Sequence, residues 1–395
     1  MTQAQPFDDP GKAVGRAGNG AAARRNIADF GQVVLVLQGG GALGAYQAGV
    51  YQALHEAKIE PDWVIGTSIG AINASLIAGN APDQRLAKLD EFWSRVAHDL
   101  AFEAASCVPG VGRAWANWLT LAAGIPAFFK PNPLAFFGAN VRLPVDAAGY
   151  YSTLPLENTL SELVDFGSIH SGPTRLTVGA ANIRTGEMRY FDSRDEALTV
   201  RHVMASGALP PAFPAVRIDG ELYWDGGIVS NTPVEAIFDD ARRRDSLVFA
   251  VHMWNPDGPE PDNITAILNR QKDIQYSSRA ISHIRRQKQI HRLRHIIAEL
   301  AMRLPENERN ANDTRDMASY GCLTRMHVVR LLAPPLEGED HTKDIDFSRK
   351  GIRARWAAGY DDARRVIEGA PWEAEVDPIE GFYLHECRPA TEPMG

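Results

Sequence analysis

The sequence contains a serine in a pattern that is typical of nucleophiles. Ser68 lies two residues after Gly66 and two residues before Gly70, which completes the pattern G-x-S-x-G. This motif requires a strand before it and a helix after it, and the apolar run at 63–65 and the small-residue run at 71–78 predict both elements. A serine in such a turn can project its hydroxyl toward a substrate, and the adjacent helix N-terminus favours charge on the substrate oxygen. The alternative is a glycine-rich turn whose serine only caps the helix.

A second glycine-rich segment precedes this serine by one strand–helix unit. Four glycines lie between a strand expected at 33–37 and a helix expected at 45–58: Gly39, Gly40, Gly41 and Gly44. The free N–H groups of such a loop can hold a developing oxyanion. The spacing also fits the G-x-G-x-x-G loop of a dinucleotide-binding oxidoreductase, but that fold requires an acidic residue at the end of the second strand. Here Asp62 lies at the start of that strand. A tight turn without any ligand is the third interpretation.

An aspartate followed by glycines can supply the base that a serine nucleophile needs. Asp225 precedes Gly226 and Gly227, and a carboxylate in such a turn can approach a serine closely and accept its proton without a histidine. His252 comes later in the chain, so the order Ser, Asp, His of a catalytic triad is also present, although an α/β-hydrolase usually has more strands before its nucleophile. A surface turn is the common alternative for an Asp-Gly pair.

The elements that must position these residues alternate between strands and helices. Further strands are predicted at 175–181, 187–191 and 247–252, and further helices at 200–206 and 263–303. This alternation indicates an α/β fold with a mainly parallel sheet and helices on its faces.

The chain divides into three parts. We expect a mobile tail at 1–31, a catalytic domain at 32–250, and a largely helical C-terminal extension at 251–395 whose function the sequence does not reveal. The catalytic domain contains an apolar insertion at about 114–138, where aromatic residues alternate with glycines and prolines.

Residues 32–240 resemble the patatin-like phospholipases, lipid acyl hydrolases that use a Ser–Asp dyad. The resemblance is carried by the glycine loop at 39–44, the motif at 66–70, the segment 205–214, and the Asp-Gly-Gly motif with Asn231 and Pro233.

This resemblance implies a three-layer α/β/α sandwich in which Ser68 is the nucleophile and Asp225 the general base. It also implies an oxyanion hole formed by N–H groups of the glycine loop at 39–41, and it calls for no metal and no cofactor. The sequence departs from the family at Leu43, where many bacterial members carry Arg or Lys. Losing that cation can weaken oxyanion stabilisation or change the head group that the site accepts.

Composition excludes several other classes of function. The 41 Lys and Arg residues against 49 Asp and Glu give a net charge of −8, which argues against a nucleic-acid binder. Three distant cysteines, Cys107, Cys322 and Cys387, provide neither a disulfide framework nor metal-ligand spacing. No signal peptide and no continuous apolar stretch long enough to span a bilayer is present. We therefore expect a soluble cytoplasmic protein, and the sequence gives no indication of its oligomeric state.

Two segments could meet a lipid surface. The aromatic insertion at 114–138 is either a lid or docking loop, or buried packing. The basic stretch at 270–295 either faces anionic head groups at the inner membrane surface, or is solvated or paired with acidic residues of the catalytic domain, which we favour. The expected function is hydrolysis of a lipid carboxylic ester. A triad esterase using His252 and a non-catalytic lipid-binding scaffold remain alternatives.

Overall fold

The computed structural model of this protein describes residues 27–97, 122–138, 140, 142–336, 339–377 and 379–386. Its strands have the following bounds: β1 Gln32–Leu37, β2 Trp63–Thr67, β3 Lys130–Pro131, β4 Tyr151–Ser152, β5 Arg175–Asn182, β6 Met188–Asp192, β7 Val216–Ile218, β8 Glu221–Asp225, β9 Ser246–His252, β10 Met326–Leu332 and β11 Phe382–Glu386. Its α-helices have these bounds: α1 Ala45–Glu56, α2 Ile69–Ala78, α3 Pro82–Val96, α6 Leu154–Leu163, α7 Phe166–Ile169, α8 Val200–Ser206, α9 Glu235–Phe238, α10 Ile264–Arg303, α11 Glu306–Arg309, α12 Asn312–Ala318 and α13 Arg349–Gly369. The short 3-10 helices are η1 Ile27–Phe30, η2 Gly41–Gly44, η3 Pro133–Phe137, η4 Val145–Ala147, η5 Gly226–Ile228, η6 Lys343–Ile345 and η7 Pro371–Glu373.

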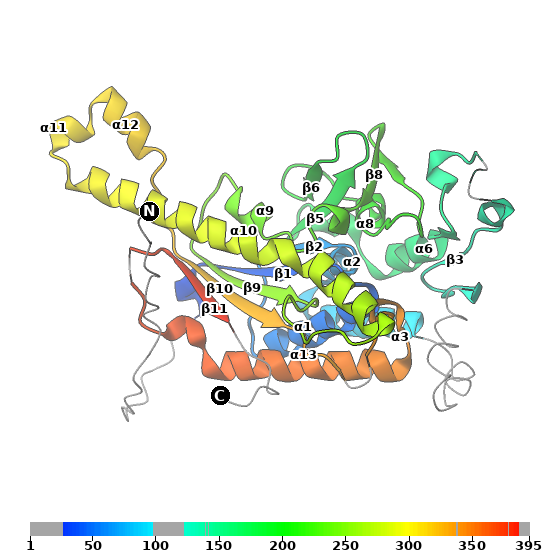
Figure 1. Ribbon diagram of the computed structural model, residues 1–395. Helices are drawn as coiled ribbons and strands as arrows, with labels where there is room; N and C mark the ends of the chain where they lie inside the picture. The colour runs from blue at the N-terminus through cyan, green and yellow to red at the C-terminus, as the bar shows by residue number, and fades with distance from the viewer. Residues whose placement is uncertain are drawn as a thin grey trace, which may run out of the picture.

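One large sheet organises the described part of the chain (Figure 1). Its strand order is β11-β10-β9-β1-β2-β5-β8-β7, with β6 paired to β5. The six strands from β11 to β5 are parallel to their neighbours, whereas β6 and β8 run antiparallel to β5 and β7 runs antiparallel to β8. Strands β3 and β4 form a separate antiparallel pair.

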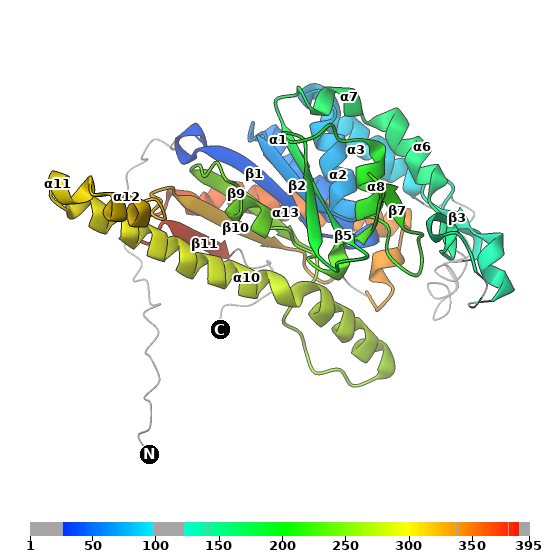
Figure 2. The ribbon, with the colours of Figure 1, turned by 90° about the horizontal axis from the view of Figure 1, so that it is seen from above.

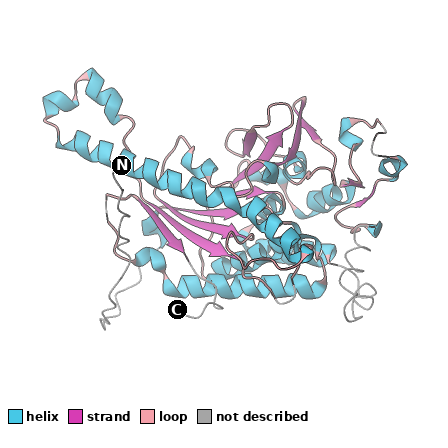
Figure 3. Cartoon of the chain, in the orientation of Figure 1, coloured by secondary structure: helices cyan, strands magenta, loops and turns pink. Residues whose placement is uncertain are grey.

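Helices cover both faces of this sheet (Figure 3). Because side chains alternate along a strand, Leu35 of β1 packs with α1, α2, α3 and α13, and its neighbour Val34 packs with α9 and α10. In Figure 2 the long helix α10 runs along one side of the sheet. The result is a three-layer α/β/α sandwich with a mainly parallel sheet, which confirms the fold class predicted from the sequence.

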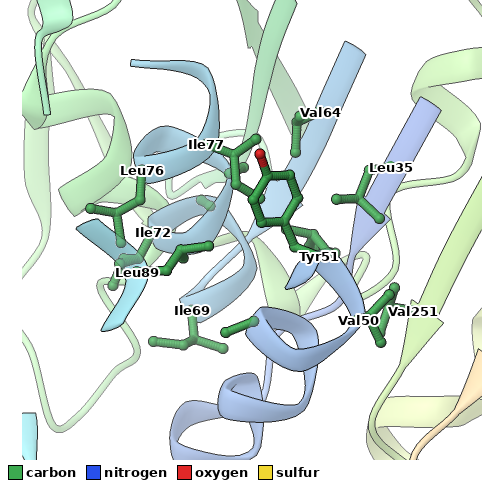
Figure 4. Close-up of a cluster of buried hydrophobic side chains, with 14 of the residues drawn as sticks. Leu35, Val50, Tyr51, Val64, Ile69, Ile72, Leu76, Ile77, Leu89 and Val251 are labelled. Carbon is green, nitrogen blue, oxygen red and sulfur yellow. The ribbon is translucent and has the colours of Figure 1, made fainter. Parts of the chain in front are cut away.

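The larger core lies between β1, β2 and the helices that follow them. Figure 4 shows Tyr51 of α1 among aliphatic side chains from the strands and from α2, including Leu35, Val64 and Ile77. All of these side chains are fully or almost fully buried, and burying each one stabilises the fold by about 1.5–3 kcal/mol. This core fixes the positions of the turns that follow β1 and β2.

Helices α1 and α13 cross at two glycines. A Cβ atom at Gly49 would clash with the carbonyl oxygen of Trp356, and a Cβ atom at Gly359 would clash with the carbonyl oxygen of Tyr46. The close crossing therefore requires glycine on both helices, and it packs a helix from the C-terminal part of the chain against the first helix of the catalytic region.

The segment 251–395 is more than a helical addition. It supplies the long helix α10, which the sequence predicted at 263–303, and also α13, β10 and β11, for which the sequence predicted no specific element. The two strands extend the sheet beyond β9. At the other end of the chain, most of the expected tail lies outside the described residues. Its last residues, Ile27–Phe30, form η1, and Phe30 is buried with its ring against His327.

Candidate active site

Ser68 occupies the sharp turn between β2 and α2. Its backbone has φ 57° and ψ −128°, in the region that favours glycine. The turn also requires glycine on either side, because a Cβ atom at Gly66 would clash with the carbonyl oxygen of Gly70, and one at Gly70 would clash with the carbonyl oxygen of Leu37. The fold thus stores strain at the residue that the sequence singled out.

Asp225 ends β8 and is only 2% exposed. Its carboxylate accepts a hydrogen bond of 2.7 Å from the Gly227 N–H, and the Ser68 hydroxyl is close enough to lower its pKa as a hydrogen-bond donor. Burial raises the pKa of Asp225 from 3.8 to about 6, although both hydrogen bonds act in the opposite direction. The carboxylate is therefore a better proton acceptor than an exposed aspartate.

Strand β5 brings these two residues together. Thr67, which precedes the serine, is opposite Gly179, and Asp225 is opposite the next residue, Ala180. Thr67 and Asp225, which are distant in the sequence, thus lie opposite consecutive residues of β5.

Ser206 adds a further link that sequence reasoning missed. Its hydroxyl accepts a hydrogen bond of 2.9 Å from the Ser68 N–H and donates one of 2.6 Å to the Gly179 carbonyl. The sequence marked the segment around Ser206 only as part of the family resemblance. A role for this hydroxyl becomes visible only when α8 is packed against β5.

The glycine loop lies beside Ser68, but Gly39, Gly40 and Gly41 differ in whether their N–H groups are already hydrogen-bonded. The Gly39 N–H donates to the Asn231 carbonyl at 3.1 Å, and the Gly39 carbonyl accepts from the Trp254 indole at 2.8 Å and from the Asn231 amide at 3.1 Å. The expectation that Gly39 belongs to the oxyanion hole is therefore corrected, because its N–H group is already bonded. Among the described residues, none accepts a hydrogen bond from the N–H groups of Gly40 and Gly41.

The other motif glycines serve packing. A Cβ atom at Gly44 would lie 2.6 Å from the side chain of Ile69, and one at Gly226 would lie 2.5 Å from the carbonyl oxygen of Gly179. Gly227 supplies the N–H bond to Asp225. These positions let the glycine loop, the serine turn and the aspartate turn approach one another closely.

A mainly apolar cavity of about 160 Å³ opens on Ser68. Its walls comprise the glycine loop, the Ser–Asp pair and a set of apolar or aromatic side chains: Ile69, Ile72, Phe128, Phe129, Tyr151, Leu209, Phe213, Trp254, Tyr276, Ile345 and Phe347. Such a cavity suits an acyl chain attached to an ester carbonyl.

The aromatic insertion contributes to this wall. Phe128 and Phe129 are buried and pack on Phe213, at ring distances of 6.3 and 5.6 Å. In the described part of the insertion these two rings are packing residues of the cavity, while residues 114–121 lie outside the described residues. Leu134, by contrast, is 52% exposed.

The C-terminal segment closes one side of the cavity. Tyr276 comes from α10, and Asp344 and Ile345 come from η6. The contact is close, because a Cβ atom at Gly41 would clash with the carbonyl oxygen of Asp344. No motif in residues 343–347 marks them as part of a site, so the sequence did not predict this wall.

Several basic residues of α10 pair with groups from residues 251–395. Lys272 pairs with Asp344 at 2.7 Å, Lys288 pairs with Glu380 at 2.8 Å, and Arg270 donates to carbonyl groups of the preceding loop. These partners lie in the C-terminal part of the chain, whereas from the sequence we expected a solvated face or acidic partners in the catalytic domain.

His252 does not join the Ser–Asp pair. It ends β9, is fully buried, and its Nε2 atom has no hydrogen-bond partner among the described residues. Burial and the nearby Arg330 lower its pKa to about 3, so the ring is neutral. The groups that lower the pKa of Asp225 as hydrogen-bond donors are Ser68 and Gly227.

The described residues contain neither a metal-binding cluster nor a membrane-spanning helix. None of their groups of His, Cys, Asp and Glu could hold a metal ion, and none of their helices is both long and apolar enough to cross a bilayer. Cys322 is a free thiol, whereas Cys107 and Cys387 lie outside the described residues.

Comparison with known families identifies the chain. Residues 35–238, more than half of its length, match the family described as Patatin-like phospholipase. The chain belongs to the patatin-like phospholipase family. Residues 274–379 match a second family, described as Patatin phospholipase. Most of the C-terminal segment thus also matches a family with a phospholipase description. Neither match is to a dinucleotide-binding family, which leaves the oxidoreductase interpretation of the glycine loop without support.

Curated relatives of this patatin-like protein cover a wide range of lengths. A patatin-like phospholipase domain-containing protein of Caenorhabditis elegans is 30% identical over 51% of this chain and 12% of its own length. An uncharacterized NTE family protein of Mycobacterium bovis is 28% identical over 60% of this chain and 55% of its own length. A lysophospholipase of Debaryomyces hansenii is 25% identical over 58% and 12%. The chain therefore spans about half or less of the length of these relatives.

Among solved structures, VipD from Legionella pneumophila aligns over 86% of this chain and 67% of its own, with a TM-score of 0.37 and 15% identity.

Proposed function

We propose that this chain is a serine acyl hydrolase that cleaves carboxylic ester bonds of lipids through a dyad of Ser68 and Asp225. The observation that carries the proposal is that the Ser68 hydroxyl and the buried Asp225 carboxylate, whose pKa is raised, line the same cavity close enough for the hydroxyl to act as a hydrogen-bond donor to the carboxylate. A serine hydroxyl alone is a poor nucleophile, and an adjacent base activates it. The membership in a phospholipase family and the apolar cavity support a lipid ester as substrate.

The first half of the proposed reaction forms an acyl-enzyme. Asp225 accepts the proton of the Ser68 hydroxyl as the oxygen attacks the ester carbonyl. The N–H groups of Gly40 and Gly41, together with the N-terminus of α2, stabilise the negative charge on the carbonyl oxygen. The protonated Asp225 then gives its proton to the departing alcohol, and a Ser68 ester of the fatty acid remains.

The second half releases the fatty acid. Asp225 accepts a proton from a water molecule, whose oxygen attacks the acyl-enzyme carbonyl. The Ser68 oxygen leaves as the proton returns to it, which restores the dyad. The raised pKa suits this role because a carboxylate near 6 is ionised at neutral pH yet holds a proton more readily than an exposed aspartate.

A matched pair of serine variants tests the proposal. The expected result is that Ser68→Ala abolishes hydrolysis of a monoacyl ester, while Ser161→Ala, at an exposed position of α6, retains the wild-type rate. Circular dichroism and the unfolding midpoint verify that both variants are folded. Turnover retained in Ser68→Ala would reject the assignment, and a wild-type protein that hydrolyses no ester would favour the non-catalytic scaffold.

Contact with a lipid interface, at the inner surface of the cell membrane, is part of the proposal. Leu134 of η3, which follows β3, and Leu154, the first residue of α6, which follows β4, are more than half exposed. The cavity residue Tyr151 of β4 pairs with Pro131 of β3, so both leucines lie close in the chain to this pair of strands. Exposed apolar side chains of this kind insert into an interface. Replacing both leucines with aspartate should reduce sedimentation with phosphatidylcholine vesicles, whereas Leu293→Asp on α10 should not. Equal binding by all variants would contradict this contact.

A further inference from the structure

The charged side chains of the catalytic cavity all have the same sign. Among its lining residues in the described part of the chain, the only charged ones are Asp225 and Asp344. The remaining walls are glycines and uncharged, mostly apolar or aromatic side chains. The cavity therefore offers no guanidinium or ammonium group to an anion.

Two lysines near the cavity, Lys272 and Lys343, are each paired with a carboxylate. Lys272 bonds Asp344 at 2.7 Å and also donates to the His341 carbonyl at 2.7 Å. Lys343 bonds Asp273 at 2.7 Å, and both partners are nearly buried. The two pairs have no net charge, so the negative charge of the ionised Asp225 is not offset by them.

The glycine loop does not supply a cation either. Leu43 is buried, its N–H donates to the Gly40 carbonyl at 3.1 Å, and a Cβ atom at Gly40 would lie 3.6 Å from the Leu43 Cβ. The side chain next to the loop N–H groups is thus apolar.

We infer that the site acts on esters whose alcohol portion carries no negative charge near the scissile carbonyl, such as monoacylglycerols, and discriminates against esters that carry an anionic phosphate there. The physical reason is repulsion. Asp225 must be ionised to accept the serine proton, and a second negative charge brought next to it in an apolar cavity is weakly screened. The inference rests on the proposed function of Ser68 and Asp225.

Three octanoyl esters that differ only in the head group test this selectivity. They are monooctanoylglycerol, octanoyl lysophosphatidylcholine and octanoyl lysophosphatidic acid, each used as a monomer in solution. We expect kcat/KM for the glycerol ester to exceed that for lysophosphatidic acid by about tenfold or more, with the zwitterion between them, and added salt to narrow the difference by screening.

The possible outcomes distinguish failure of this inference from failure of the proposed function. Hydrolysis of lysophosphatidic acid at a rate equal to or above that of the glycerol ester would overturn the inference alone. No hydrolysis of any of the three esters, together with no labelling by a fluorophosphonate, would overturn the proposed function and the inference with it.

An isosteric variant tests the charge itself. Asp344→Asn removes one negative charge from the cavity and keeps an oxygen that can bond Lys272. We expect the ratio of kcat/KM for lysophosphatidic acid to that for the glycerol ester to rise by roughly threefold to tenfold. Asp361→Asn, at an exposed position of α13, should leave this ratio unchanged. An unchanged ratio in Asp344→Asn, or an equal rise in both variants, would contradict the electrostatic explanation.

Discussion

Replacing Asp225 with asparagine is expected to stabilise the folded protein while abolishing ester hydrolysis. Burial raises the pKa of this carboxyl from 3.8 to about 6, a shift of about 2 units, and each unit corresponds to 1.36 kcal/mol, so ionisation of the buried group costs the fold about 3 kcal/mol at pH 7.5. Asparagine has nearly the same shape, can accept the Gly227 N–H bond, and carries no charge that must be desolvated.

The pH dependence of this effect has a definite sign. Because the pKa is higher in the folded state than in the unfolded state, folding favours the protonated carboxyl. The destabilisation is fully present above about pH 6 and disappears as the pH falls toward 3.8. The stability difference between Asp225→Asn and the wild type should therefore fall from about 3 kcal/mol at pH 7.5 to about 1 kcal/mol at pH 4.5.

Urea unfolding followed by tryptophan fluorescence measures this difference at both pH values. Asp361→Asn, at an exposed aspartate of α13, is the control and should change the unfolding free energy by no more than about 0.5 kcal/mol. If Asp225→Asn were less stable than the wild type at pH 7.5, or if its advantage did not depend on pH, the buried carboxylate would not be the strained group that the site geometry indicates.

Three further results follow from the site. The value of kcat/KM should fall about tenfold per pH unit below about pH 6, because protonated Asp225 cannot accept the serine proton; a flat profile down to pH 5 would contradict this. His252→Asn should keep kcat/KM within about threefold of the wild type, because His252 is not bonded to the dyad, whereas loss of a triad histidine costs about 10⁴-fold or more. Trp254→Phe removes the indole donor to the Gly39 carbonyl and should lower kcat roughly tenfold with little change in KM, because the loop N–H groups lose alignment. Steady-state kinetics measure these values, and an unchanged kcat in Trp254→Phe would show that the loop is held without this bond.

The sequence was informative where local pattern determines structure. The β-branched run of β1 and the glycine turns after β1 and β2 predicted the first two strand–helix units, and the prediction of a helix at 200–206 coincides with α8, Val200–Ser206. These elements form from signals within a few residues: short buried strands, small residues at turns, and helical spacing of apolar residues. The same signals placed Ser68 and Asp225 in turns.

The parts that the sequence did not reveal depend on partners distant in the chain. Strand β8 is short and half polar, and it becomes a strand because its end pairs with β5. Helix α13 crosses α1 at Gly49 and Gly359, and neither glycine shows its role until both helices are in place. For the same reason the bond from the Gly39 N–H to the Asn231 carbonyl, which removes Gly39 from the oxyanion hole, could not be read from either segment alone.

Active-site labelling tests the central claim most directly. A fluorophosphonate reacts with a serine that a neighbouring base has activated, and peptide mass spectrometry identifies the modified residue. The account predicts one label per chain, attached to Ser68, with labelling strongly reduced in Asp225→Asn and unaffected in His252→Asn. A label on a different serine, or labelling of Ser68 that does not depend on Asp225, would contradict it.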